Sequence, residues 1–394
     1  MNLVLRVLRR IFWIICYVFP VKNNKIVFQS YYGREYNDNP KYIAEELKKD
    51  KENIDFVWVT NGRDDPAVPE GFRVVRFRGF RYIYEMSTAK IWVDNSRKEY
   101  CMKKKNQFYI QTWHGGGAQK KSELDATDNL APLYIKMAKR DSANIDLMIS
   151  ESRFMTDFYH RSFWYDGPVY ECGYPRYDIL LKHDEELITK VYEYFGIDHN
   201  KELVLYAPTF RADYSFKAYD IDFDRLRANL KKRFNKDYVI LVHLHPNVAN
   251  IEGGINYDGV NVINSTFYPD TQELIAVSSI LIGDYSSINY DFCLKRMPVF
   301  RYTSDLEEYR NDRDLYFPFD EYPYPYAQNN DELEQLILNF NEEDYLKTLN
   351  VFFDRLGSVI QDSASRRIAD LIIDYIHSKN KQDFFKHNNS KFIY

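Results

Sequence analysis

Residues 280–302 read Ile280-Leu-Ile-Gly-Asp284-Tyr-Ser286-Ser287-Ile-Asn-Tyr-Asp-Phe-Cys-Leu-Lys-Arg-Met-Pro298-Val-Phe-Arg-Tyr302, and they carry the clearest structural pattern in the chain. An apolar strand is followed by a tight polar turn, a short helix and a second apolar strand after Pro298. This order predicts a βαβ unit. The turn falls at the carboxyl end of the first strand, where open α/β sheets bind their ligands.

The turn from Asp284 to Ser287 suits an anion. The hydroxyls of Ser286 and Ser287 can cap the helix, and the helix N-terminus offers backbone N–H groups and a partial positive charge to a phosphate. The alternative is that Asp284-Tyr-Ser-Ser serves only as a helix cap. On this stretch alone both interpretations stand.

Short apolar strands alternate with polar or amphipathic segments along most of the chain. The first expected strands are Ile26–Gln29, Asp55–Val59, Arg73–Phe77, Lys90–Val93, Phe108–Thr112, Asp146–Ile149 and Val169–Glu171. The helices expected among them include Pro40–Lys49, Ser122–Arg140 and Arg153–His160. A polar segment near residues 183–200 precedes a second series of strands. These are Leu203–Tyr206, Val239–Val242, Val260–Ile263, Ile280–Ile282 and Val299–Arg301. The C-terminal part is expected to be helical, with an amphipathic run around Ile360–His377. Such alternation predicts parallel, doubly wound sheets.

The expected fold class is therefore α/β and GT-B-like, with two Rossmann-like domains facing across a cleft. A chain of 394 residues is long enough for two domains. We expect a membrane-associating segment at residues 1–22, one Rossmann-like domain at 23–183, a second at 200–378, and a loose tail at 379–394.

The first twenty residues combine basic and bulky apolar side chains. Arg6, Arg9 and Arg10 precede the apolar run Ile11–Pro20. This run is too short to span a hydrocarbon core, which needs about 20 residues, and no small-residue cleavage site follows it. The composition is typical of a helix lying in a membrane interface. The alternative is a core helix that packs on its domain.

Charge and cysteine content exclude other classes. The net charge of −5 argues against sequence-independent nucleic-acid binding, so no nucleic-acid partner is expected. The cysteines form no CxxC pair, which indicates neither a zinc ribbon nor a disulfide framework and fits a reducing compartment.

A glycine-rich run follows another expected strand. After Phe108–Ile110 the chain reads Gln111-Thr-Trp-His114-Gly115-Gly116-Gly117-Ala-Gln-Lys120-Lys121. The glycines let the backbone approach a ligand closely, and Lys120 and Lys121 supply positive charge. His114 can act as a general base near neutral pH. The alternative is a glycine turn with a histidine satisfied by structural hydrogen bonds.

Arginine and hydroxyl side chains follow two further strands. In Cys172-Gly-Tyr-Pro-Arg176-Tyr-Asp178, Arg176 can hold a phosphate and Asp178 can cap a helix. In Tyr206-Ala-Pro-Thr209-Phe-Arg211, Thr209 and Arg211 fall at the expected cleft rim. Arginine suits bidentate contact with phosphate, although a surface salt bridge is an equally ordinary role.

Two histidines end the strand at Val242, in the sequence Val242-His243-Leu-His245-Pro246. Strand alternation puts both imidazoles on one face, as in some metal pairs. No carboxylate or cysteine lies beside them in sequence, so we expect no metal. Pro246 should end the strand and leave His245 at its mouth.

Missing motifs exclude several enzyme classes. A His-Gly-Gly-Gly run occurs in α/β-hydrolases, but the chain has no Gly-x-Ser-x-Gly elbow, no Gly-x-Gly-x-x-Gly fingerprint and no Walker A loop. The Asp-x-Asp runs at residues 220–224 follow no convincing strand, which leaves a metal-bound nucleotide-sugar site unsupported. The remaining polar strand ends suit a diphosphate held by side chains and a helix terminus.

Together the motifs resemble the CDP-glycerol glycerophosphotransferase family, the primases and polymerases of teichoic-acid synthesis in Gram-positive bacteria. The matching residues, in chain order, are Tyr32-Gly33, Tyr36-x-Asp38-Asn39-Pro40-Lys41, Gln111-Thr-Trp-His114-Gly115, Gly173-Tyr-Pro175-Arg176-x-Asp178, Tyr206-Ala-Pro-Thr209-x-Arg211, His245-Pro246 and Asp284-Tyr-Ser286-Ser287. Each motif is weak alone, but the ordered set spans nearly the whole chain. One departure is Gly116-Gly117, where the family often has Thr-Pro.

The resemblance implies a GT-B fold, with the acceptor side at residues 23–183 and CDP-polyol binding at 200–378. It implies His114 and His245 as catalytic residues. The donor- and phosphate-binding residues that it implies are Gly115, Lys120, Arg176, Thr209, Arg211, Asp284, Ser286 and Ser287. It implies no cofactor beyond the substrate CDP-glycerol, a peripheral location at the cytoplasmic face of the cell membrane, and leaves a homo-oligomer open.

The implied reaction is attack by an acceptor hydroxyl on the distal phosphorus of CDP-glycerol, with release of CMP. The acceptor would be a lipid-linked (polyprenyl diphosphate) saccharide or a polyol-phosphate chain. Alternatives are a CDP-ribitol donor, a GT-B glycosyltransferase that uses a nucleotide sugar, and a scaffold without catalysis.

Overall fold

The computed structural model describes residues 3–50, 52–62, 68–209, 211, 219–244, 257–312 and 314–394. Within these ranges the chain forms two compact units, each with one parallel sheet. The first unit contains Met1–His114, Ser122–Asp178 and Ser358–Tyr394, and the second contains Gly115–Lys121 and Ile179–Gly357. The predicted α/β class with parallel sheets is confirmed.

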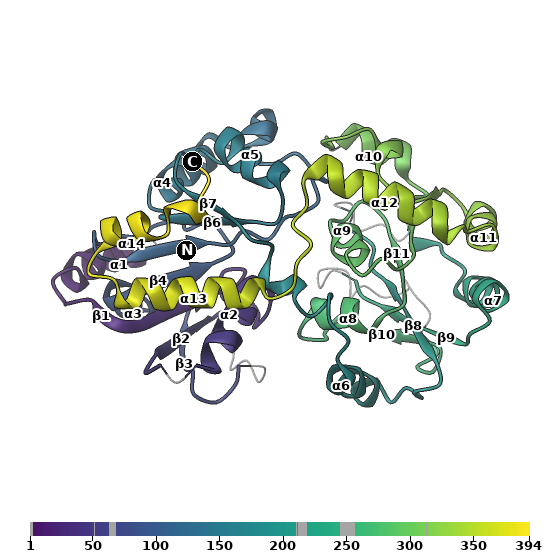
Figure 1. The fold of residues 1–394 in the computed structure, drawn as a ribbon, viewed down its shortest axis with the longest axis horizontal. Coiled ribbons are helices and arrows are strands. Elements are labelled where there is room, and N and C mark those ends of the chain that lie inside the picture. Colours follow the sequence, from purple (N-terminus) through teal and green to yellow (C-terminus); the bar gives the residue numbers. More distant parts are fainter. Residues whose placement is uncertain are drawn as a thin grey trace. The chain divides into compact units, whose positions relative to one another are not determined.

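The sheet of the first unit has the strand order β3-β2-β1-β4-β5-β6-β7 (Figure 1). Its strands are β1 (Lys22–Gln29), β2 (Asp55–Thr60), β3 (Arg73–Arg76), β4 (Ala89–Asp94), β5 (Phe108–Gln111), β6 (Leu147–Ser150) and β7 (Val169–Glu171). Every residue of β4 is buried, as expected for a central strand covered by helices on both faces. The order reverses between β1 and β4, so their carboxyl ends form a topological switch point.

The helices of the first unit come from both ends of the chain. They are α1 (Leu3–Cys16), α2 (Asp38–Lys48), α3 (Phe80–Thr88), η1 (Glu123–Asn129), α4 (Pro132–Ser142), α5 (Arg153–Ser162), η2 (Pro175–Tyr177), α13 (Ala364–His377), α14 (Lys381–His387) and η5 (Asn389–Lys391). The single helix predicted at Ser122–Arg140 is wrong, because Pro132 starts a new helix and cannot donate a backbone hydrogen bond to the preceding turn.

The second unit repeats the same winding, with the strand order β10-β9-β8-β11-β12-β13. Its strands are β8 (Glu202–Tyr206), β9 (Tyr238–Val242), β10 (Val262–Asn264), β11 (Ile280–Gly283), β12 (Val299–Tyr302) and β13 (Tyr326–Ala327). Its helices are α6 (Glu185–Phe195), α7 (Phe223–Phe234), α8 (Thr271–Val277), α9 (Ile288–Cys293), α10 (Leu306–Asp312), η4 (Phe319–Glu321), α11 (Asn330–Leu338) and α12 (Glu342–Leu356). The switch point here lies between β8 and β11.

The polar segment expected near residues 183–200 is largely the helix α6 of the second unit. The side chain of Asp184 accepts a hydrogen bond from the Leu187 backbone N–H and starts the helix. Gly196, with φ of 66°, ends it in the left-handed conformation. Val191 and Tyr192 are buried, so the segment packs as an amphipathic helix and is not an open linker.

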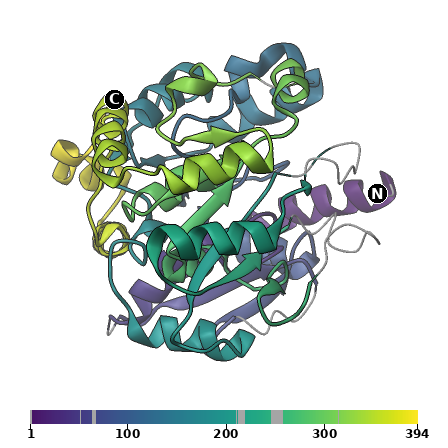
Figure 2. The ribbon, with the colours of Figure 1, turned by 90° about the vertical axis from the view of Figure 1, so that its right-hand side faces the viewer.

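The C-terminal residues depart most from expectation, because residues 358–394 belong to the first unit. The Asp178 carboxylate accepts hydrogen bonds of 2.8 Å from the Ala364 and Ser365 backbone N–H groups and so caps α13. The expected loose tail at 379–394 is wrong, since α14 buries Phe384 completely and Ile393 pairs with Val169 through two backbone hydrogen bonds. In Figure 2 this yellow end and the purple α1 lie on opposite sides of the first unit.

The N-terminal helix α1 packs with one face and exposes the other. Trp13 and Cys16 are buried, and the Phe12 and Phe80 rings meet edge to face at 5.0 Å. The exposed apolar side chains of α1 are Val4, Val7, Leu8, Ile11, Ile14 and Ile15. No helix within the described ranges has the length and apolar character to cross a membrane. Membrane association therefore stays a prediction.

Candidate active site

The switch point of the second unit brings together two residues that were predicted from separate motifs. Strands β8 and β11 run in parallel with Tyr206 beside Ile282, so the residues that follow them meet at one edge. The Thr209 backbone N–H donates to Asp284 Oδ2 at 2.7 Å, and its hydroxyl donates to Asp284 Oδ1 at 2.6 Å. Asp284 is 1% exposed, so this pairing is shielded from water.

Arg211 joins the same cluster through two carboxylates. Its guanidinium donates to Asp284 at 3.0 Å and to both carboxylate oxygens of Asp305, and it also donates to the Thr209 carbonyl at 2.6 Å. These carboxylates raise the pKa of Arg211 further above its ordinary value against the opposing effect of burial. The guanidinium thus fixes the loop after β8. Its predicted contact with phosphate stays a prediction.

A pair of stacked tyrosines links Lys120 to this cluster. The Tyr285 and Tyr309 rings lie parallel with centroids 3.5 Å apart, and Tyr285 donates its hydroxyl hydrogen to Asp305 at 2.9 Å. The Lys120 ammonium lies 5.4 Å from the Tyr309 centroid, and the Arg211 guanidinium lies 5.1 Å from that of Tyr285. Two cations therefore approach one aromatic platform, as cation–π attraction favours.

The glycine-rich run is split between the units, since His114 belongs to the first and Gly115–Lys121 to the second. A Cβ on Gly117, whose φ is +67°, would lie 2.2 Å from the Tyr290 ring. The Tyr322 hydroxyl donates to the carbonyls of Ala118 and Gln119 at 2.8 and 3.0 Å. The close approach predicted for a ligand at Gly117 is thus made by a protein side chain.

Ser286 and Ser287 precede α9 as predicted, but only one hydroxyl bonds to the helix. The Ser286 hydroxyl accepts a 3.4 Å hydrogen bond from the Ile288 backbone N–H. Ser287 occupies the N-cap in a helical conformation and makes no side-chain cap hydrogen bond, so its predicted capping is wrong. Asn289 instead closes the turn by donating to the Asp284 carbonyl at 3.0 Å.

The two histidines after β9 cannot be compared as a pair, because His245 lies outside the described residues. His243 Nδ1 lies 2.9 Å from the Ser265 carbonyl and its Nε2 lies 3.0 Å from the Thr271 hydroxyl. Both ring nitrogens of His243 therefore have structural partners. Across the described ranges, no three His, Cys, Asp or Glu side chains gather to hold a metal ion.

The switch point of the first unit carries polar side chains that the sequence did not single out. The Gln29 amide donates to Asp94 at 2.7 Å, across the ends of β1 and β4. The Tyr31 backbone N–H donates to the Asn95 side chain at 2.9 Å, and the Asn95 amide donates to Ser30 at 3.1 Å. These bonds fix the loops on either side of the reversal.

His114 follows the next strand, β5, and is held in one tautomer. Its Nδ1 lies 2.6 Å from the backbone carbonyl of Asn95. A carbonyl only accepts, so Nδ1 carries the proton and Nε2 keeps its lone pair. The Trp113 and Tyr31 rings flank the imidazole at 4.3 and 5.2 Å between centroids. Burial lowers the pKa of His114, which favours the neutral base at pH 7.

Arg176 and Asp38 position the chain at His114. The Arg176 guanidinium donates to the His114 carbonyl at 3.0 Å and to the Asp38 carboxylate at 3.4 Å. The Tyr31 hydroxyl donates to the same carboxylate at 2.6 Å. Arg176 is 2% exposed, so these contacts describe an orienting role, and its predicted hold on a phosphate stays a prediction.

The structure thus groups the predicted site residues into two sets. Arg176 lies with His114 in the first unit, and Lys120, Thr209, Arg211 and Asp284 lie together in the second. Sequence reasoning gave no role to Asn95, Tyr285, Asp305 and Tyr309. The signal available for Asn95 was its position in Asp94-Asn95-Ser96, directly after the strand predicted at Lys90–Val93. Asp305 and Tyr309 lay in no recognisable pattern.

Comparison with protein families gives one match along nearly the whole chain. A family model described as CDP-glycerol:poly(glycerophosphate) glycerophosphotransferase matches residues 11–374. The teichoic acid poly(glycerol phosphate) polymerase of Staphylococcus epidermidis is 32% identical over 376 residues, covering 89% of this chain and 51% of that relative. The polymerase of the same name from Bacillus spizizenii is 28% identical and is covered over 97% of its length. The chain therefore spans about half of the first relative and nearly all of the second.

A solved structure shows a similar fold. The wall teichoic acid polymerase TagF superimposes with a TM-score of 0.82 at 30% identity, and the match covers 93% of each chain. Relatives named for ribitol phosphate polymers also match this sequence.

Proposed function

The chain belongs to the CDP-glycerol:poly(glycerophosphate) glycerophosphotransferase family, and we propose that it transfers glycerol phosphate from CDP-glycerol to an acceptor hydroxyl. The acceptor is a lipid-linked saccharide or a polyol-phosphate chain of a teichoic acid or a related cell-surface polymer. The new bond joins the acceptor oxygen to the distal phosphorus. The bond from that phosphorus to the bridging oxygen breaks, and CMP leaves with the oxygen.

The observation that carries this proposal is the hydrogen bond from His114 Nδ1 to the Asn95 carbonyl. It leaves Nε2 as the ring nitrogen that can take the acceptor proton. General base catalysis of this kind contributes roughly 10² to 10⁴ in rate. Arg176 and Asp38 support the step by orienting the backbone at His114.

In the second unit we assign donor binding to the cluster at the ends of β8 and β11. Lys120 supplies positive charge to the diphosphate, and Thr209, Asp284 and Arg211 hold the loop that receives it. Ser286 and Ser287 stand before α9 in the same turn. The family resemblance implies His245, which lies outside the described residues, as a second catalytic residue, and we keep it in the proposal on that ground alone. Groups of this kind stabilise negative charge on the leaving phosphate. Such electrostatic stabilisation is usually the largest single contribution to the rate enhancement.

We further propose that the protein acts as a peripheral protein at the cytoplasmic face of the cell membrane. The exposed apolar face of α1 supports this, because soluble proteins rarely expose a continuous apolar patch without a partner. Each large apolar side chain that enters a lipid interface contributes at most about 1.5–3 kcal/mol.

A donor panel tests the proposed reaction. Purified protein is incubated with a lipid-linked glycerol phosphate acceptor and one of CDP-glycerol, CDP-ribitol, a UDP-sugar or a GDP-sugar, and the released nucleotide is quantified. We expect CMP from CDP-glycerol. CMP from CDP-ribitol alone would favour the ribitol alternative, which the matches to ribitol phosphate enzymes support. Release of UDP or GDP alone would overturn phosphoglycerol transfer.

A further inference from the structure

The first unit contains a cavity that is distinct from the His114 cluster, which comprises His114, Asn95, Tyr31, Asp38 and Arg176. Its volume is about 760 Å³, and it lies among α1, α3, α4 and the segments that follow β1 and β4. Gln29 and Tyr32 line it from the β1 side, and Arg97, Lys98 and Glu99 line it from the β4 side. It therefore occupies the switch point of this sheet, the place where open α/β folds bind ligands.

The cavity lining is strongly cationic, with eight Arg or Lys side chains and one carboxylate. Two of the cations are neutralised within the protein: Arg97 pairs with Glu123 at 2.8 Å, and Lys98 pairs with Asp94. The other six are Arg6, Arg9, Arg10, Arg78, Lys136 and Arg140. Glu99 is the one carboxylate among the lining residues, so positive charge is in excess and the cavity suits an anion of more than one charge.

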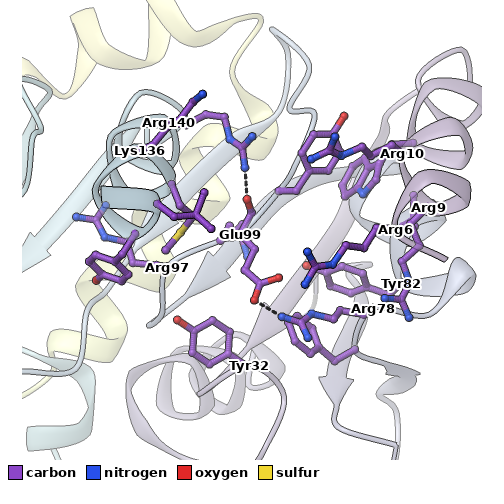
Figure 3. A pocket seen from close by; sticks show the side chains of 18 of the residues that line it. Arg6, Arg9, Arg10, Tyr32, Arg78, Tyr82, Arg97, Glu99, Lys136 and Arg140 are labelled. Atoms are coloured by element: carbon purple, nitrogen blue, oxygen red, sulfur yellow. Dashed lines mark hydrogen bonds and ion pairs between the residues drawn. The ribbon is translucent and has the colours of Figure 1, made fainter. Parts of the chain in front are cut away.

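Figure 3 shows how these groups are arranged. Arg6, Arg9 and Arg10 come from α1 on one side, and Lys136 and Arg140 come from α4 on the other. Glu99 lies between them, where its carboxylate pairs with Arg78 and its carbonyl accepts a hydrogen bond from Arg140.

The cations of α1 also lie near those at the end of β3 and in the turn before α3. Partial burial and the neighbouring guanidiniums of Arg78 and Arg76 lower the pKa of Arg9. Like charges held this close repel one another, and a bound anion relieves that repulsion.

The walls of the cavity are apolar between the cations. Trp13, Phe77, Tyr82, Tyr100 and Tyr134 contribute rings, and Leu133, which also lines the cavity, is 79% exposed. A small inorganic anion would gain nothing from these apolar walls. An anionic group attached to a hydrocarbon chain would interact with both parts of the lining, because its charge contacts the arginines and its chain packs against the rings.

The helix α1 joins this cavity to an apolar outer surface. Arg6, Arg9, Arg10 and Trp13 follow the i, i+3, i+4, i+7 spacing of one helix face and line the cavity. Val4, Val7, Ile11 and Ile14 follow a different face and are 61%, 48%, 48% and 58% exposed. An amphiphile anchored in a membrane under α1 would thus have its charged group beside the cavity.

We propose that this cavity binds the phosphate or diphosphate group of a membrane-anchored isoprenoid, the lipid part of the acceptor. The inference rests on the proposed function for the identity of the acceptor. The cavity and the His114 cluster share one chain segment: Tyr32 lines the cavity, and the neighbouring Tyr31 ring lies 5.2 Å from that of His114.

Calorimetric titration of the full chain without nucleotide tests the proposal. The probes are farnesyl diphosphate below its micellar concentration and inorganic pyrophosphate. The cavity variant is Arg6→Gln/Arg10→Gln/Lys136→Gln, and the matched control is Lys22→Gln/Lys105→Gln/Lys139→Gln. The control removes the same charge from the same unit at side chains that do not line the cavity. The sharpest single comparison is Lys136→Gln with Lys139→Gln, because both residues lie on α4.

We expect farnesyl diphosphate to bind the native chain more tightly than pyrophosphate does. The cavity variant should weaken its binding by about tenfold or more, as expected for lost charge-assisted contacts, and the control should not. Equal weakening in the control, equal binding of pyrophosphate, or no binding by the native chain would overturn the proposal. Because no donor is present, these results are independent of CMP release, so failure of the cavity and failure of the proposed reaction are separable.

Discussion

At His114 a single backbone contact selects the reactive nitrogen. The Asn95 carbonyl accepts from Nδ1, and the Trp113 and Tyr31 rings flank the imidazole. The neutral ring is favoured because burial removes solvation from the charged form. The imidazole is thus in its basic, neutral form at pH 7, and its Nδ1 is bonded to a backbone carbonyl and not to a carboxylate.

The first prediction concerns pH. Burial lowers the pKa of His114 below its ordinary value of 6.5, so the base form should persist below pH 6.5. The acid limb of kcat/KM, which reports the free protein, should therefore have its midpoint below 6.5, measured as CMP release at CDP-glycerol concentrations well below KM.

The free energy of unfolding should depend on pH in the same direction. The unfolded chain binds the proton of His114 more readily, so this contribution to stability is present above pH 6.5 and is lost as the pH falls through the folded pKa. A midpoint above 6.5 would contradict a buried neutral base.

The second prediction concerns Asp284, whose two oxygens accept from Thr209 and Arg211. Asp284→Asn replaces one acceptor oxygen by a donor and should destabilise the second unit by about 1–3 kcal/mol, because hydrogen bonds to buried charges are lost. We expect the KM for CDP-glycerol to rise more than kcat falls. Chemical denaturation and steady-state kinetics measure the two effects. Asp237→Asn, at an exposed pair with Lys231, is the control, and an unchanged KM in Asp284→Asn would contradict the donor-side assignment.

The residues that sequence reasoning could find are those next to strands. Thr209 and Asp284 were predicted because each follows an apolar run, and parallel strands deliver such residues to one edge. Asp305 and Tyr309 reach the same cluster from the segment after β12. Nothing local marks them, since their roles arise only when the tyrosine stack forms.

Among the elements, the loop Gly115–Lys121 and the helix α9 depend on each other. Gly117 lies against Tyr290 so closely that a Cβ has no room, and its backbone occupies the left-handed region. The glycine is needed for packing inside the second unit. At the second position of the Gly116-Gly117 departure from Thr-Pro, this chain therefore requires glycine for packing.

The third prediction tests that packing. Gly117→Ala should destabilise the protein by about 1–3 kcal/mol from overpacking against Tyr290, in addition to the cost of a positive φ. The control is Gly259→Ala, whose φ is +72° and whose Cβ would meet nothing within 4 Å, so it reports the backbone cost alone. Thermal unfolding followed by circular dichroism measures both. Equal shifts in Tm would contradict the packing role of Gly117.

Helices were harder to predict than strands. The buried apolar strands stand out as short runs, and the strands that were predicted all form, whereas β13, with two residues, was missed. The helix α6 looked like a polar connector because only one narrow face of it is buried. Pro132 marks the start of a new helix in the sequence itself, because it cannot donate a backbone hydrogen bond to a preceding turn.

For the whole molecule, the sequence predicted two parallel sheets but not which segments build each unit. Residues 358–394 return to the first unit because Asp178 caps α13 and Phe384 packs against Phe108 and Tyr375. These partners are distant in sequence, and no local pattern connects them. The GT-B arrangement of the units stays a prediction.

The fourth prediction concerns the membrane. Replacing Val7 and Ile14, exposed on α1, with Asp should abolish co-sedimentation with vesicles that contain anionic phospholipid, because charge on this face opposes insertion. Turnover with a water-soluble acceptor should persist, since neither residue lines the cavity or the His114 cluster. The control is Val351→Asp, at a 69% exposed position on α12 of the second unit. Unchanged vesicle binding by the α1 variant would contradict the role of this helix.

The central claim is that the chain transfers glycerol phosphate with His114 as the base, and one measurement tests it directly. CMP release from CDP-glycerol, with a lipid-linked glycerol phosphate acceptor, is compared between the native chain, His114→Ala and the control His183→Ala, whose side chain is exposed beside Glu185. We predict that His114→Ala lowers the rate by about 10² to 10⁴ while the variant remains folded at the assay temperature and the control keeps full activity. Native rates of CMP release from a folded His114→Ala variant would contradict the claim.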